Sequence, residues 1–326
     1  MKKILTAWAG CVILVFGCTK SSVTEEEIID PETTSGISAH KCASQEVLEQ
    51  QLKEDPALAE RMRKIESVID YYESNPTAGR LINGYVEIPV VVNVLYKTAA
   101  ENISATQIQT QIDVLNQDFA ATNSDYNNTP ATFQSVRAGD TKIKFVLSST
   151  VRKSTNKKSW GTNDAMKKSS TGGIDPTNPT TSLNIWSCNM GGGILGYAQF
   201  PGGSAATDGV VIDNNAFGNT GTAAAPYGKG RTATHEVGHW LNLRHIWGDA
   251  TCGNDLVNDT PVAQSSNGGC PAFPSYGSCS STVPMMTMNY MDYTYDACMY
   301  MFTSGQNTRM QATFAVGGGR YSFAQP

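Results

Sequence analysis

The segment at residues 235–245 reads His-Glu-Val-Gly-His-Trp-Leu-Asn-Leu-Arg-His. On a helix, His235 and His239 lie one turn apart on the same face, where two neutral imidazoles can hold one Zn²⁺. Glu236 lies beside them and is well placed to reach a zinc-bound water. This segment therefore predicts a helix that carries both a metal site and a general base.

A third metal ligand has to come from beyond this helix. His245 is six residues past His239, and a continuing helix would carry it away from the metal. The chain must therefore turn sharply, and Asn242 stands where the turn is needed, since Asn tolerates the left-handed conformation. Three of the four histidines lie in this segment, which makes an ordinary helix with surface histidines a poor explanation.

Motifs on both sides of this segment resemble those of a known family. The third histidine, followed by Asn289-Tyr290-Met291-Asp292-Tyr293, resembles the Met turn of the metzincin clan of zinc proteases. Within the clan the chain resembles the secreted bacterial pappalysins over residues 80–315. The motifs that carry this resemblance are Leu183–Trp186, Leu195–Gly202, Cys252, Val257–Pro261, Cys270, Cys279, Cys298 and Phe302–Met310. Asn242 departs from the pattern, because metzincins usually have glycine there.

The resemblance implies a role for each residue of the site. Zn²⁺ would be held by His235, His239 and His245. Glu236 would be the general base, and Tyr293 would stabilise the oxyanion of the transition state. The implied reaction is hydrolysis of a peptide bond by a zinc-bound water.

Three further expectations accompany this assignment. Met291 would pack beneath the zinc without ligating it. The segment Ile194–Phe200 is predicted to be an edge strand that pairs with an extended substrate backbone. Family members favour a basic residue just after the cleaved bond, and Asp296 is a candidate counter-charge for such a specificity pocket.

Four of the eight cysteines crowd a loop-rich region, which indicates disulfides in an exported protein. These are Cys252, Cys270, Cys279 and Cys298. Four cysteines allow three pairings, and their spacing does not choose among them. The resemblance implies Cys252–Cys279 and Cys270–Cys298. Cys188, inside a strand pattern, is predicted to be a buried free thiol.

Cys42 has two interpretations. It can be a zymogen switch, whose thiolate takes the place of water on the zinc, or it can be an inert thiol. The oxygen-rich run at residues 249–260 likewise suits either Ca²⁺ or ordinary turn chemistry. The resemblance favours a structural calcium site, for which Asp255, Asp259 and Thr260 are the candidate ligands.

The N-terminal region has the pattern of an exported precursor. Residues 1–17 predict a signal peptide of the lipoprotein type, with Cys18 as the lipid attachment site, or else an ordinary secretory signal. Residues 18–40 are polar and indicate a flexible tether. Residues 41–79 predict a helical propeptide with a processing zone at Arg61, Arg63, Lys64 and Arg80. The protein would then be secreted, or anchored at the bacterial outer membrane or cell surface.

Residues 80–326 are predicted to form one metzincin-like catalytic domain of the α+β class. Strands are expected at 86–96, 143–151, 183–186, 194–200 and 210–213, and helices at 104–120, 231–243 and 306–314. They would form a twisted mixed sheet with a backing helix and an active-site helix. An irregular lower subdomain would be held by the disulfides.

Composition narrows the choice of partners. The net charge of −5 and the pI near 5.4 disfavour a nucleic-acid binder. A single apolar run at the N-terminus rules out a polytopic membrane protein, so membrane contact is expected only through the lipid anchor. The expected protein is a monomeric zinc endopeptidase that acts on proteins or peptides. The alternative is a non-catalytic surface lipoprotein on a protease scaffold, against which the presence of Glu236 argues.

Overall fold

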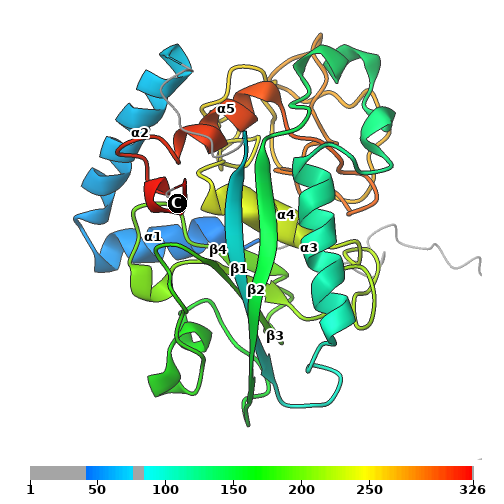
Figure 1. The fold of residues 1–326 in the computed structure, drawn as a ribbon. Helices are drawn as coiled ribbons and strands as arrows, with labels where there is room; N and C mark the ends of the chain where they lie inside the picture. The colour runs from blue at the N-terminus through cyan, green and yellow to red at the C-terminus, as the bar shows by residue number, and fades with distance from the viewer. Residues whose placement is uncertain (1–41, 76–83, 325–326) are drawn as a thin grey trace, which may run out of the picture. The chain divides into compact units, whose positions relative to one another are not determined.

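The computed structural model describes residues 42–75 and 84–324. Five strands form one mixed sheet in the order β2–β1–β3–β5–β4 (Figure 1). Their bounds are β1 Val86–Tyr96, β2 Ile143–Ser154, β3 Leu183–Cys188, β4 Gly196–Ala198 and β5 Val210–Asp213. β4 pairs antiparallel with β5, while the other neighbours are parallel. The predicted mixed sheet is confirmed, and β4 is an edge strand as expected.

The two faces of the sheet carry separate cores because side chains alternate along each strand. One face of β1, including Val90, Val92 and Val94, packs with the helices α3 (Ala105–Phe119) and α4 (Arg231–Trp240). On the other face, Trp186 and Tyr197 pack with side chains that include Val47 of helix α1 (Ser44–Glu54). The backing helix and the active-site helix therefore lie on the same side of the sheet.

Local sequence accounts for the ends of three helices. The Ser104 hydroxyl accepts a hydrogen bond from Gln107 N at 3.0 Å, as expected of an N-cap residue. α4 ends at Trp240, earlier than predicted, because the chain already enters a turn at Leu241. α5 (Ser304–Ala312) begins earlier than predicted because Thr303 and Gln306 form a capping box.

The region that the sequence predicts to be a propeptide forms two helices, α1 (Ser44–Glu54) and α2 (Leu58–Ser74). Asp55 lies between them and accepts a hydrogen bond from Ala57 N at 3.1 Å. One face of α2 is apolar, and its Ile65 and Ile69 are buried in a cluster with Ala312 of α5. The short 3-10 helices are Tyr126–Asn128, Ala131–Val136, Ala165–Lys167, Ser169–Thr171, Ala205–Thr207 and Tyr321–Ala324.

Between α4 and α5 the described chain has turns and isolated bridges in place of regular elements. Two disulfides cross this region, Cys252–Cys279 and Cys270–Cys298, which are the pairs that the family resemblance implies. Cys42 and Cys188 are buried free cysteines. Within the described part of the chain, every helix is too short or too polar to cross a bilayer. The predicted signal peptide, Cys18, the tether and Arg80 lie outside the described residues.

Candidate metal centre and active site

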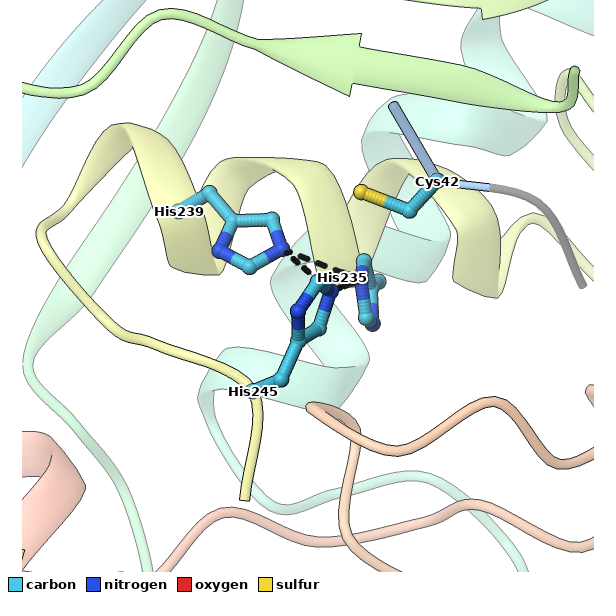
Figure 2. A group of neighbouring side chains, drawn as sticks. All are labelled: Cys42, His235, His239 and His245. Atoms are coloured by element: carbon cyan, nitrogen blue, oxygen red, sulfur yellow. Dashed lines mark hydrogen bonds between the residues drawn. The ribbon is translucent and has the colours of Figure 1, made fainter. Parts of the chain in front are cut away.

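Three histidines converge at the end of α4 (Figure 2). The Nε2 atoms of His235, His239 and His245 lie 3.0–3.3 Å from one another. Each Nδ1 atom is held by an oxygen: His235 by Tyr290 O at 2.7 Å, and His239 by Leu243 O at 2.8 Å. Nδ1 of His245 lies 2.5 Å from Asp249 Oδ1.

These partners determine where the protons lie. A carbonyl oxygen only accepts, so Nδ1 of His235 and of His239 must carry the proton, and each Nε2 is left with a lone pair. Burial lowers the pKa of His235 to about 4, and those of His239 and His245 well below the ordinary histidine value. Neutral imidazoles with lone pairs facing one another repel unless a cation lies between them.

The spacing of these atoms fits zinc. In a tetrahedral site with Zn–N bonds of about 2.0–2.1 Å, two ligand nitrogens lie about 3.3 Å apart. The observed Nε2 separations of 3.0–3.3 Å are close to that value. The donor set therefore fits a metal ion of this kind without rearrangement of the helix.

The turn that returns His245 to the other histidines has the predicted geometry. Asn242 has a φ of 70°, in the left-handed region, and Leu243 N donates to Gly238 O at 2.9 Å. Gly238 also allows the Met turn to approach, because a Cβ there would collide with the sulfur of Met291. Met291 is fully buried against this side of α4. The Met turn thus supports α4 by packing.

Residues of the predicted propeptide lie in the site. Cys42 joins the three histidines in a group whose ligand atoms lie within 4.8 Å of one another. The Ser44 hydroxyl donates to Glu236 Oε2 at 2.8 Å and accepts from Ala198 N of β4 at 2.8 Å. Ala43 N donates to Gly196 O at 3.0 Å. This segment therefore contacts the histidine cluster, Glu236 and the edge strand together.

Glu236 and Tyr293 also lie in this buried site. Glu236 is fully buried, which raises its pKa to about 8, and its Oε1 atom has no hydrogen-bond partner in the described structure. The Tyr293 hydroxyl donates to Cys42 O at 3.2 Å, and its ring packs on His235 and His245. Tyr293 can therefore donate to a carbonyl oxygen beside the histidines.

Buried residues far away in sequence hold α4 in place. Asp118 of α3 accepts hydrogen bonds from Thr234 at 2.7 Å and from the Tyr290 hydroxyl at 2.8 Å. Arg231 makes two hydrogen bonds of 2.6 Å to Asp125. Sequence reasoning missed these residues, because separations of more than one hundred residues leave no local pattern. The contact of Asp249 with His245, four residues away, could have been found from spacing.

The candidate calcium ligands and the candidate specificity residue make hydrogen bonds within the described chain. Asp255 accepts from Thr260 Oγ1 at 2.7 Å, and Asp259 accepts from Thr303 Oγ1 at 2.6 Å and Gly305 N at 2.8 Å. Asp296 lies at the start of α4, where its Oδ2 atom accepts from Lys229 N at 2.8 Å. Its Oδ1 atom is buried with no hydrogen-bond partner in the described structure, and burial raises its pKa to about 6.

Comparison with known proteins finds metalloproteases, in agreement with the metal-binding geometry of this site. Residues 187–315 match the model of the M43 peptidase family, described as pregnancy-associated plasma protein-A. An extracellular metalloprotease from Verticillium alfalfae is 32% identical over 244 residues, covering 70% of this chain and 78% of that protein. Extracellular metalloprotease 1 from Coccidioides posadasii is 34% identical over 242 residues, covering 70% and 76%.

The chain belongs to the pappalysin family of metalloproteases. Mature mirolysin from Tannerella forsythia, solved with a cleaved peptide, is 47% identical to this pappalysin. The match covers 74% of this chain and 96% of that one, with a TM-score of 0.72. A promirolysin mutant from the same organism is 43% identical, with a TM-score of 0.79 and coverage of 87% and 97%. The metzincin-like α+β fold is thereby confirmed.

Proposed function

We propose that this pappalysin is a zinc endopeptidase that is made in a latent form and exported. The observation that carries the proposal is the convergence of three Nε2 lone pairs at 3.0–3.3 Å, beside a buried glutamate. His235, His239 and His245 would hold the zinc. When bound, the zinc would lower the pKa of a water molecule and polarise the scissile carbonyl.

The chain's own residues would move the protons. Glu236 would accept a proton from the attacking water and pass it to the leaving amine. Its Oε1 atom has no hydrogen-bond partner among the described residues, which supports this role in proton transfer. Tyr293 would donate a hydrogen bond to the oxyanion, as its hydroxyl now does to the Cys42 carbonyl. β4 would pair with the substrate backbone, as its Gly196 carbonyl now accepts from the propeptide region.

The same contacts support latency. Cys42 would occupy the fourth ligand position, and the Ser44 hydroxyl hydrogen-bonds Oε2 of Glu236, so the propeptide would restrain this carboxylate beside the metal site. Promirolysin matches a larger share of this chain than mature mirolysin does, 87% against 74%. We therefore infer that the segment from residue 42 to α2 is a propeptide that must leave before substrate can bind.

We further propose that the substrates are peptides or proteins outside the cell. Mature mirolysin was solved with a cleaved peptide, and the curated relatives are named as extracellular metalloproteases. Export would follow from the N-terminal signal, with Cys18 as the lipid anchor if the signal is of the lipoprotein type. The buried, unpartnered Oδ1 atom of Asp296 supports a pocket for a basic side chain after the cleaved bond. We expect the enzyme to act as a monomer.

Replacement of Glu236 tests the mechanism. The Glu236→Ala variant should keep its zinc, because the three histidines are unchanged, but lose about 10²–10⁴-fold in peptide cleavage. Metal analysis and a peptide-library digest should be run on the same activated sample. Undiminished cleavage by this variant would disprove the role of Glu236 as general base.

Structural calcium at residues 249–260 remains a prediction. Thermal melts of the chain after treatment with a calcium-selective chelator, with and without added Ca²⁺, test it. A higher melting temperature on addition of Ca²⁺ is the expected result, and an unchanged melt would argue against a calcium site.

A further inference from the structure

Two buried arginines hold the turn that follows α4. The last carbonyls of a helix have no partner inside the helix and need one elsewhere. Arg320 Nε donates to Trp240 O at 3.0 Å, and Arg309 Nε donates to Asn242 O at 2.9 Å. Arg320 is 4% exposed and Arg309 is 1% exposed, so both side chains are buried where they hydrogen-bond this turn. The same turn delivers His245 to the metal site.

The two arginines differ in the origin of their counter-charges. Arg320 pairs with Asp208 at 2.6 Å, and both residues belong to the catalytic domain. Arg309 pairs with Glu66 of α2, with Nη1–Oε1 at 2.6 Å and Nη2–Oε2 at 2.7 Å. This is a bidentate, charge-assisted pair, which is among the stronger and more directional ion pairs in proteins.

Glu66 also reaches the turn itself. Its Oε2 atom accepts from Asn242 Nδ2 at 3.4 Å, on the residue whose left-handed conformation makes the turn. Glu66 therefore contacts both the turn and the arginine that holds it. Its pKa is lowered by Arg309 despite the opposing effect of burial, so it is ionised in this position.

We propose that Arg309 is a positioning residue for the third-histidine loop, residues 241–245, and that Glu66 of the propeptide reinforces it until the propeptide leaves. The inference rests on the proposed function, in which this loop delivers a zinc ligand and α2 is removed. Loss of one partner from a buried ion pair leaves the other charge uncompensated. Arg309 then holds Asn242 O less firmly, while the Arg320–Asp208 pair is unchanged. The loop is consequently more tightly held in the precursor than in the mature enzyme.

The test uses the full chain in a background of Cys42→Ala and Glu236→Gln. In this background the thiol cannot hold zinc and the chain cannot cut itself. Zinc release to a chromogenic chelator is compared for the parent, Glu66→Gln, Arg309→Lys and Arg309→Gln. Glu60→Gln is the matched control, because Glu60 also lies on α2 but, among the described residues, forms its ion pairs with Arg63 and Lys64 of its own helix.

We expect zinc to leave about three to ten times faster from Glu66→Gln, and about 10–100 times faster from Arg309→Gln. Arg309→Lys should fall between the parent and Arg309→Gln, since lysine restores the charge and one donor but not the fork. Glu60→Gln should match the parent. Hydrogen exchange of the amides at 241–248, measured on the zinc-free chains, should rise in the same order.

Some results would overturn the proposal. Parental zinc release and parental exchange in both Glu66→Gln and Arg309→Lys would show that the loop does not depend on this pair. Arg309→Lys keeps the test decisive if Arg309→Gln does not fold. Failure of the proposed function would look different, because the parent chain itself would then bind no stoichiometric zinc.

Discussion

At the scale of single residues, the metal site is set by what the second nitrogen of each imidazole contacts. Two backbone carbonyls and one carboxylate, from Asp249, hold the three Nδ1 atoms, so the Nε2 atoms face one another. Such outer contacts fix the tautomer and orientation of metal-ligating histidines. The site is therefore preorganised by the chain before a metal binds.

The first prediction concerns the pH dependence of metal binding. Burial lowers the pKa of His235 to about 4, and those of the other two histidines also lie below the ordinary value. A lowered pKa means that the neutral, metal-binding form persists to lower pH. We expect metal content, measured after dialysis of the Cys42→Ala chain, to be constant from about pH 7 to pH 5 and to fall as pH approaches 4. Half-loss near pH 6.5 would contradict this.

The second prediction concerns Ser44. Its hydroxyl makes two buried hydrogen bonds of 2.8 Å, to Glu236 and from Ala198 N. Ser44→Ala should weaken the closed propeptide by about 1–3 kcal/mol, because a buried hydrogen bond to a carboxylate is lost. The lag before activity appears should be shorter in Ser44→Ala than in the parent chain. It should also be shorter in Cys42→Ala, and shortest in the variant that carries both changes. Ser67→Ala, at an exposed position on α2, is the control. If the lag is unchanged in Ser44→Ala, in Cys42→Ala and in the double variant, steric cover by the propeptide is the cause of latency.

At the scale of elements, the N-terminus of α5 is capped by a side chain from a distant loop. Asp259 receives hydrogen bonds from Thr303 Oγ1 and Gly305 N, at the N-terminus of α5. A carboxylate at this position also interacts favourably with the helix dipole. Both of its oxygens are thus engaged by the helix that carries Arg309.

The third prediction follows from this cap. Asp259→Ala should lower the free energy of unfolding by about 1–2 kcal/mol, measured by urea denaturation. Because the helix engages both oxygens, the loss should be the same in calcium and in chelator. Asp113→Ala on α3, whose contact with Gln109 is exposed, should change little. A loss seen only in calcium would instead make Asp259 a calcium ligand.

At the scale of the whole molecule, the proposed propeptide is packed on the rest of the described chain at several points. Arg61 Nε donates to Gly202 O at 2.7 Å, Glu66 pairs with Arg309, and Cys42 lies against the histidines. Three of the four basic residues of the predicted processing zone, Arg61, Arg63 and Lys64, lie within α2. Backbone held in a helix is a poor protease substrate compared with an exposed loop.

The fourth prediction is therefore that activation depends on the remaining basic residue, Arg80. Arg80→Ala should lengthen the lag of the full-length chain, and N-terminal sequencing of the active form should begin near this residue. Arg63→Ala, at an exposed position on α2, should leave the lag unchanged. A mature N-terminus inside residues 58–74 would show that α2 unfolds before it is cut.

The amino-acid sequence by itself determined the features that depend on near neighbours. The spacing of His235 and His239, the left-handed Asn242, the Ser104 cap and the strand pattern of Val86–Tyr96 are local, so the chain's periodicity and turn chemistry predict them. Resemblance to a family supplied the disulfide pairs, between which spacing could not choose. The ends of two helices differ from the prediction, because the turn before Asn242 already begins at Leu241 and because Thr303 caps α5.

Only the tertiary structure decided which distant residues support the site. Ser44 meets Glu236 across 192 residues, Glu66 meets Arg309 across 243, and Asp118 meets Tyr290 across 172. Each contact joins polar groups that burial forces to find a partner, and packing of separate elements selects that partner. No periodicity along the chain encodes such a choice, since it exists only once the sheet and the helices α1 to α4 have packed together.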